Sequence, residues 1–305
     1  MRKFFLTMWF LYAIVSALFL GIYDVLKKVS VNDNAVFPVL LVSTMSSAFL
    51  FLPVFILSNN GILNEGDLLF IPHADGKTHL FIFAKAVLVL TSWIFSFFAL
   101  KHLPLTVVSP IRATGPLWTL IGAILIFGEQ LNMLQWIGLI ITLAFFYLFS
   151  TIGKLEGLSL KNNKWFWFII LATLTGAASG LYDKYLMTNL DRMAVQSWFS
   201  VYQALLMVPI VYLVWYPQRS KHSPFKFRWS IPLVGIMLVI ADFAYFYALS
   251  NPEALISVIS ALRRGSVIIA FVFGAILFKE KNIKQKAIYL TGILTGILLL
   301  LLGSM

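Results

Sequence analysis

The sequence contains no cysteine, few charged residues and no long polar segment, and each absence narrows the class of protein. Without cysteine the chain forms no disulfide and has no thiol nucleophile or thiolate metal ligand. Charged residues make up 11% of its 305 residues, against about a quarter in an average soluble domain. Hydrophobic residues make up 60%. This composition is typical of a membrane protein and not of a soluble domain.

Apolar windows long enough to cross a membrane recur along the whole chain. A helix of about 20 apolar residues spans about 30 Å of hydrocarbon. Windows of this kind cover residues 5–26, 34–57, 79–100, 104–127, 132–152, 165–187, 193–215, 229–249, 254–278 and 283–302. They are apolar on all sides, whereas the strands of a membrane barrel alternate apolar and polar residues. We therefore predict an all-α membrane protein with ten transmembrane helices.

Two partly polar motifs occur once in each half of the chain. GIYD at 21–24 returns as GLYD at 180–183, which is 159 residues later. ILIFGEQ at 124–130 returns as AILFKEK at 275–281, which is 151 residues later. Because the matched positions include charged residues, chance similarity between apolar runs explains them poorly. The two unequal shifts are what loops of different length would give.

The repetition divides the ten helices into two halves of five, which we place at 1–153 and 154–305. Because each half crosses the membrane an odd number of times, we expect two inverted five-helix repeats. Inverted repeats are typical of secondary transporters, whose substrate site lies near the midplane where the repeats meet. With the N-terminus inside, the inner loops would carry five Lys and Arg and the outer loops fourteen, so the loop charges favour both termini outside.

Three arginines lie deep inside expected helices. Arg112 is about eight residues into the window 104–127, and Arg263 and Arg264 are about ten residues into the window 254–278. An arginine at the centre of a membrane helix costs about 3 kcal/mol on insertion scales. An adjacent pair at this depth therefore indicates a functional site.

Serines accompany these arginines, Ser109 beside Arg112 and Ser260 beside Arg264, at helical spacings of three and four. Neither polar face can meet lipid without cost, so we expect both to face a common cavity. Asp242 is the only acidic residue at comparable depth, which leaves an excess of positive charge. A guanidinium stays charged when dehydrated and offers a fork of donors to carboxylate or phosphate. We expect a small anionic substrate there, with pairing to internal acids as the alternative.

Other polar side chains near this region each have two interpretations. Asp242 is either a counter-charge for Arg263 or Arg264 or a proton-coupling carboxylate. Lys85 either adds to the basic cavity or extends to the membrane surface. Three tyrosines either line the cavity or pack between helices: Tyr23, Tyr182 and Tyr245. Two acid–base pairs at equivalent helix ends either close gates or are ordinary headgroup-level charges: Asp24 with Lys27, and Asp183 with Lys184.

No sequence motif indicates an enzyme. HExxH, GxSxG and P-loop motifs are absent, and the four histidines are scattered among loops and helix ends. We expect no catalytic residue, no metal and no cofactor. The net charge of +11 lies mostly beside helix ends, where Lys and Arg contact lipid headgroups, so we expect membrane lipids and no nucleic acid as partners. Gly292 and Gly296 suit close helix packing or a dimer face, so we expect a monomer or weak homodimer in the plasma (inner) membrane.

The whole pattern resembles the drug/metabolite transporter superfamily, in its EamA-like branch. The resemblance lies in the ten helices, the two halves, the GxxD opening followed by Lys27, and two helix-ending glutamates, Glu129 and Glu280. It implies alternating access around a central cavity, and both termini in the cytoplasm, against the loop charges. SPIRATGP and SALRRGSV also resemble plastid phosphate translocators, which carry one basic residue on the fourth helix and an adjacent basic pair on the ninth. Those translocators use Lys at the first two of these positions.

Together these features predict a secondary transporter for a small anionic metabolite, carboxylated or phosphorylated, with exchange as one open mode. Arg112, Arg263 and Arg264 would neutralise the anion at mid-depth. The alternative is a broad-specificity exporter of amphiphiles, amino acids or drugs, in which aromatic walls bind the substrate and the arginines brace helices. A second alternative is a flippase for anionic lipids.

Overall fold

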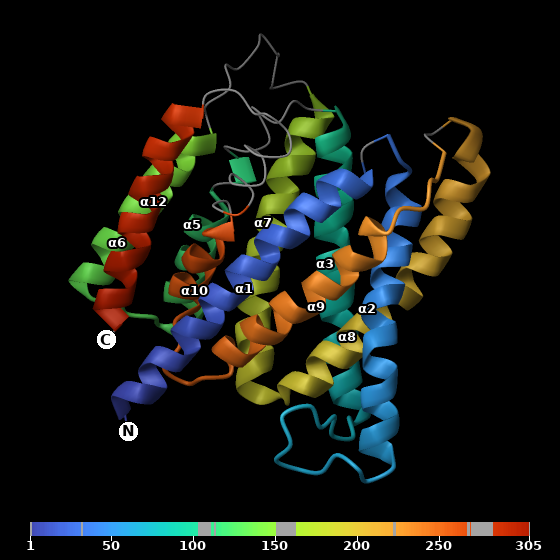
Figure 1. Ribbon diagram of the computed structural model, residues 1–305, viewed down its shortest axis with the longest axis horizontal. Helices are drawn as coiled ribbons and strands as arrows, with labels where there is room; N and C mark the ends of the chain where they lie inside the picture. Colours follow the sequence, from blue (N-terminus) through green and yellow to red (C-terminus); the bar gives the residue numbers. More distant parts are fainter. Residues whose placement is uncertain are drawn as a thin grey trace.

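The computed structural model describes residues 2–31, 33–102, 111–112, 114–150, 163–221, 224–266, 269 and 283–304. All regular structure in these ranges is helical (Figure 1). The α-helices are α1 (Arg2–Val31), α2 (Val36–Asn59), α3 (Gly76–His102), α5 (Gly115–Phe127), α6 (Met133–Ser150), α7 (Lys164–Asn189), α8 (Arg192–Ile210), α9 (Ser230–Leu249), α10 (Ile256–Arg263) and α12 (Ile283–Ser304). After α8 the chain continues as a π-helical turn, η1 (Val211–Trp215), and a 3-10 turn, η2 (Tyr216–Lys221).

Six helices are long and apolar enough to cross a membrane, namely α1, α2, α3, α7, α8 and α9. Shorter apolar stretches lie in α5, α6 and α12. The predicted all-helical architecture is therefore confirmed across the described ranges. The windows 104–127 and 254–278 extend beyond those ranges, so the count of ten crossings stays a prediction.

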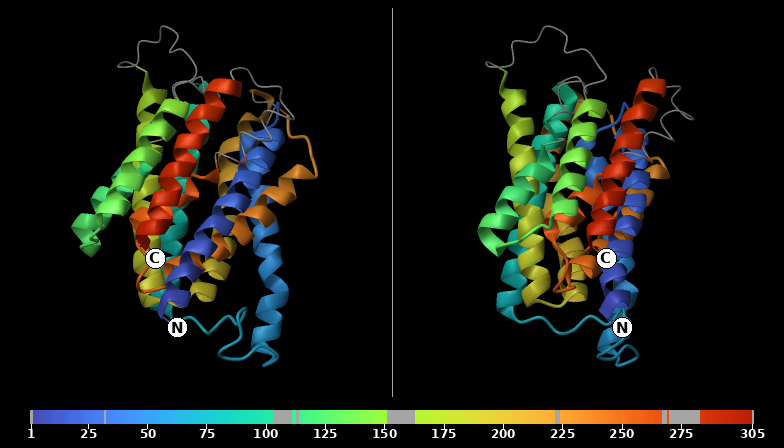
Figure 2. Two further views of the ribbon diagram at one scale, coloured as in Figure 1. Left: turned by 60° about the vertical axis from the view of Figure 1, so that its left-hand side comes forward. Right: turned by 90° about the vertical axis from the view of Figure 1, so that its left-hand side faces the viewer.

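The helix contacts occur in matched pairs. Helix α1 packs on α9 as α7 packs on α3, and α2 packs on α9 as α8 packs on α3. Two further contacts join equivalent helices to each other: α2 with α8, and α6 with α12. This pattern fits a two-repeat architecture, while the boundary at 153 and the inversion stay predictions. Both chain ends lie toward the same end of the bundle (Figures 1 and 2), as an even number of crossings requires.

Several helix ends are encoded by local side chains. Asp191 caps α8 by accepting hydrogen bonds from two amides of its first turn, at 2.8 and 3.0 Å. Gly128 ends α5 with a φ of 63°, a left-handed conformation that suits glycine. In the loop before α3, hydrogen bonds from Thr78 lower the pKa of the Asp75 carboxyl below its usual value. These residues fix where the helices begin or end.

Helices α6 and α12 pack closely against each other along one side of the bundle (Figure 2). A Cβ atom on Gly138 would lie 2.7 Å from the carbonyl oxygen of Gly296, and one on Gly296 would lie 2.3 Å from Oγ1 of Thr142. A Cβ atom on Gly292 would lie 2.2 Å from the ring of Phe145. The glycines of α12 therefore contact α6 of the same chain. These contacts support close helix packing, one of the two predicted roles, while the dimer face stays a prediction.

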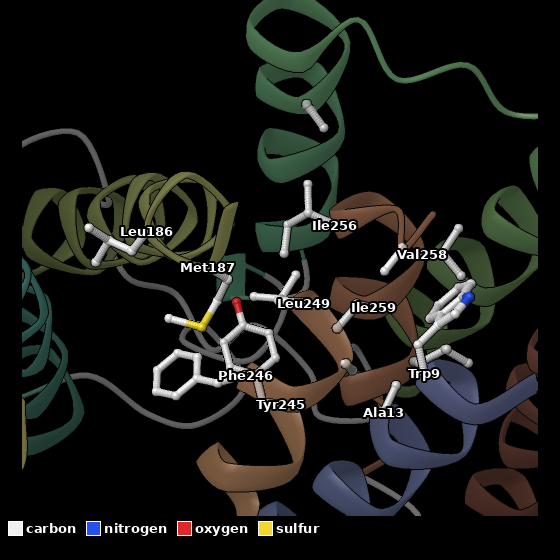
Figure 3. Packing of buried hydrophobic residues seen from close by; sticks show 14 of the residues in the cluster. Trp9, Ala13, Leu186, Met187, Tyr245, Phe246, Leu249, Ile256, Val258 and Ile259 are labelled. Atoms are coloured by element: carbon white, nitrogen blue, oxygen red, sulfur yellow. The ribbon is translucent and has the colours of Figure 1, made fainter. Parts of the chain in front are cut away.

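The largest apolar core lies beside the start of α1 and the turn between α9 and α10 (Figure 3). Trp9 and Ala13 of α1 pack there with residues of α9 and α10 (Figure 3). Leu300, near the end of α12, belongs to the same cluster. The core therefore fills the bundle near both chain ends.

Candidate functional site

A polar cavity of about 290 Å³ lies among α1, α3, α5, α7, α8, α9 and α10. Its lining contains five basic side chains: Lys27, Lys85, Arg112, Arg263 and Arg264. It also contains three acidic side chains: Asp24, Asp183 and Asp242. Among the described residues the lining thus carries an excess of two positive charges. Its volume is close to the lower end of the range for small-molecule sites, about 300 Å³.

Helical spacing places these groups on the faces that meet the cavity. Ser260 of α10 and Arg264, which directly follows this helix with helical backbone angles, are four residues apart, and Arg263 ends the helix between them. On α9, Asp242 and Tyr245 are three residues apart. Residues three or four apart share one side of a helix, so each helix presents a short polar stripe in an otherwise apolar surface. The predicted common cavity is therefore present in the described part of the chain.

Lys85 and Asp183 form a buried ion pair between α3 and α7. Their side chains are 3% and 8% exposed, and Nζ of Lys85 donates to the Asp183 carboxylate. The ammonium also lies 4.4 Å from the ring centroid of Phe199 and 5.0 Å from that of Phe246, within the range of cation–π attraction. Of the two interpretations of Lys85, the structure supports the one that places it in the cavity wall.

The predicted pair between Asp183 and Lys184 is wrong. Lys184 donates instead to the carbonyl oxygens of Ala254, at 2.7 Å, and Asn251, at 3.5 Å. Consecutive residues of a helix point about 100° apart, so the two side chains reach different neighbours. A gating role for Lys184 stays a prediction, with a different partner.

The other predicted gate pair lines the cavity on α1. Asp24 and Lys27 both belong to the lining, and Nζ of Lys27 lies 5.5 Å from the ring centroid of Tyr23. Tyr23 is buried, at 7% exposure, and also lines the cavity. The gating role of this pair stays a prediction.

Arg263 is held by residues of α9. Its Nη2 lies 3.1 Å from Oδ1 of Asp242, and its guanidinium carbon lies 3.9 Å from the ring centroid of Tyr245. Asp242 is therefore a counter-charge for Arg263, one of its two predicted roles. The structure leaves its proposed role in proton coupling untested.

Arg264 and Arg112 differ from their basic neighbours. Neither side chain makes a hydrogen bond or ion pair with any residue that the structure describes. Arg264 is partly buried, and a Cβ atom on Gly115 would lie 3.0 Å from its Nη2. Gly115 begins α5, so the positive end of that helix lies at the same place. The arrangement concentrates positive potential beside an open volume.

The remaining predicted site residues divide into three groups. Ser260 and Tyr245 line the cavity. Tyr182 and Lys184 lie outside its lining, and the hydroxyl of Tyr182 donates to the carbonyl oxygen of Phe81 at 3.1 Å. Ser109 lies outside the described residues.

Sequence analysis missed several lining residues: Ser92, Ser96, Thr119, Thr173 and Phe199. The spacing of Ser92 and Ser96, four residues apart in an apolar helix, is a signal that would have found them. Within the described ranges no group of three or more His, Asp or Glu side chains is arranged to hold a metal ion.

The sequence matches the model of the EamA-like transporter family in two segments, residues 7–151 and 163–302. The chain belongs to the EamA-like transporter family. It is therefore an integral, multi-pass membrane transporter, as its apolar helices also indicate. Members of such a family are not enzymes in general. The resemblance to plastid phosphate translocators rests on the arginine motifs alone.

The fold is also found among solved structures. One, described only as "Crystal structure of protein", superposes with a TM-score of 0.68 over 98% of this chain and 96% of the other, at 14% sequence identity. At that identity the likeness shows the fold alone. No curated protein matches the sequence.

Proposed function

We propose that this transporter is a secondary transporter that moves a small anionic metabolite, carboxylated or phosphorylated, across the plasma membrane by alternating access. The observation that supports the proposal is the excess of two positive charges in the cavity lining, where Arg112 and Arg264 form no ion pair with a described residue. An ionisable side chain inside a membrane is costly and is retained chiefly for function. A bound anion is the natural complement of these two charges.

Two of the cations that line the cavity already form ion pairs with acidic side chains. Lys85 is matched by Asp183, and Arg263 by Asp242, so neither cation is free to neutralise a ligand. We therefore assign anion binding to Arg264 and Arg112 and assign the other two cations to support of the site. Ser260, on the same face of α10 as Arg264, is placed to donate a further hydrogen bond.

The excess charge also favours exchange over one-way transport. When the cavity closes without a ligand, two unmatched cations must lose solvent, and burying an uncompensated charge costs several kcal/mol. A bound anion removes that penalty in both directions of the cycle. Transport should therefore be fastest when an anion is present on both sides of the membrane.

Counterflow into proteoliposomes tests the proposal. Vesicles loaded with inorganic phosphate, a three-carbon phosphate ester or a dicarboxylate would be assayed for uptake of the same labelled anion. We expect uptake by the parent protein and loss of at least 100-fold in Arg264→Ala, with Arg219→Ala as a surface-arginine control that keeps full activity. Full counterflow activity in a correctly inserted Arg264→Ala protein would contradict the proposal.

A second candidate, a broad exporter of amphiphiles, is favoured by one observation. Aromatic rings from four helices line the same cavity: Tyr23, Trp93, Phe199, Tyr245 and Phe246. A thermal-shift screen of the purified protein separates the two candidates. Stabilisation by organic phosphates or dicarboxylates favours the anion transporter, and stabilisation by hydrophobic organic cations favours the exporter.

A further inference from the structure

Helix α10, which ends at Arg263 directly before Arg264, begins without a capping side chain of its own. The residue before it, Leu255, is extended and makes no side-chain cap. The first amides of an α-helix have no partner within the helix, and in an apolar surround they need an external acceptor. This need is met from a distant part of the chain.

Glu129, in the turn between α5 and α6, supplies the missing acceptors. Its Oε1 accepts from the amide of Ile256 at 2.6 Å. Its Oε2 accepts from the amide of Ser257 at 3.2 Å and from the hydroxyl of Ser257 at 2.5 Å. A carboxylate at this position also interacts favourably with the positive end of the helix. Three hydrogen bonds thus fix the start of α10 to a residue of the first half of the chain.

Lys184 fixes the same turn from another side. This lysine of α7 is 9% exposed, and its Nζ donates to the carbonyl oxygens of Ala254 and Asn251, directly before α10. Glu129 accepts hydrogen bonds from amides of α10, while Lys184 donates hydrogen bonds to carbonyl oxygens of the turn before it. The turn between α9 and α10 is thus held by oppositely charged residues from two other elements.

The fixed turn lies in the apolar core near the chain ends. Ala254 and Ile256 belong to the same buried cluster as Trp9 of α1 and Leu300 of α12. Figure 3 shows Ile256 and Trp9 in this cluster. Leu131, two residues after Glu129, packs against this cluster. Ile256 also lines the cavity, so the core forms the cavity wall on that side.

We propose that Glu129 is a positioning residue, and that its bond to α10 closes the cavity at the end of the bundle where the termini lie. Helix α10 is eight residues long, so about 12 Å of rigid helix joins this bond to the two arginines. Movement of the bonded end therefore moves Arg264 in the cavity. The effect on anion binding rests on the proposed function, whereas the closing contact does not.

Accessibility of one introduced cysteine tests the closing contact. Because the chain has no cysteine, Thr119→Cys places a single thiol in the cavity wall. An anionic methanethiosulfonate would be added to either side of proteoliposomes, with the side of the termini identified by protease access to a C-terminal tag. Glu129→Gln should raise the labelling rate from the side of the termini at least threefold, because the amide keeps one acceptor and loses the charge.

Two variants accompany this measurement. Glu129→Asp keeps the carboxylate with a shorter reach and should give a rate between those of the parent and Glu129→Gln. Glu253→Gln removes an exposed carboxylate in the turn before α10 and should leave the rate unchanged. Equal rates in Glu129→Gln and Glu253→Gln would overturn the proposal. So would faster labelling from both sides, since that is the result of a merely structural role.

Counterflow of labelled inorganic phosphate provides the second readout. Glu129→Gln should raise the KM several-fold, with partial recovery in Glu129→Asp, because Arg264 is no longer held in place. A lower amount of folded protein with an unchanged KM would contradict the positioning role. If even the parent exchanges no phosphate, that result counts against phosphate as a substrate, while the side-dependent labelling still decides the closing contact.

Discussion

The cavity holds positive charge in two regions of different design. The paired region contains two ion pairs: Lys85 with Asp183, and Arg263 with Asp242. The unpaired region contains Arg112 and Arg264, which have no such partner among the described side chains. A buried pair loses stability when one partner is removed, whereas an unmatched cation already carries its cost in the resting protein. Adjacent arginines at the end of one short helix are thereby separated into a structural residue and a proposed ligand-binding one.

Breaking the Lys85–Asp183 pair should have the largest effect on stability. Lys85→Met leaves the Asp183 carboxylate without a counter-charge. The site is buried, because the Lys85 and Asp183 side chains are 3% and 8% exposed. Removing one partner of a buried pair costs about 3–5 kcal/mol, so the unfolding temperature of the purified protein should fall markedly. Lys85→Met combined with Asp183→Leu should recover most of the loss, since apolar replacement of both partners is close to neutral. A single variant as stable as the parent would show that the pair contributes nothing.

Arg263→Ala and Arg264→Ala should change stability in different directions. The first leaves Asp242 without its partner, and because these side chains are 19% and 17% exposed, we expect a smaller cost, about 1–3 kcal/mol. The second removes an unmatched charge and should leave stability unchanged or raise it by about 1 kcal/mol at most. Thermal unfolding of both variants in detergent measures the contrast. Equal destabilisation by the two substitutions would show that the paired and unpaired regions do not differ in this respect.

Gly115→Ala should have the smallest effect and should act only on the unpaired region. Its Cβ atom would lie 3.0 Å from Nη2 of Arg264, so the guanidinium must shift by a few tenths of an ångström. We expect counterflow KM for the transported anion to rise about threefold, less than 1 kcal/mol in binding. Gly76→Ala is the matched control, because nothing lies within 4 Å of its Cβ position. Equal KM values in the two variants would place the anion away from Arg264.

The charged lining of the cavity could be found from the sequence. Arg112, Arg263, Arg264, Asp242 and Lys85 all lie inside apolar helical windows, where ionisable residues are rare and costly. All five line the cavity. The two-half organisation was also visible, because polar motifs recur at nearly constant shifts. These inferences succeed because they depend only on the membrane and on helical periodicity.

The partners of these charges could not be predicted. Asp183 and Lys184 are neighbours in the sequence, but they contact α3 and the α9–α10 turn respectively. Those contacts depend on which helices lie beside α7, which tertiary packing decides. Glu129 is similar, because it was recognised as a helix-ending residue while its partners lie 127 and 128 residues away. A single sequence gives the charges, and the packing of the helices determines which of them are neutralised.

The volume of the cavity has a consequence for water. At about 290 Å³, the cavity is large enough to hold several water molecules. A substrate that enters must replace part of this water, and closure must expel or enclose the rest. The transport cycle is therefore coupled to hydration as well as to charge. Solutes too large to enter the cavity should favour the substrate-bound states, in which the cavity holds less water.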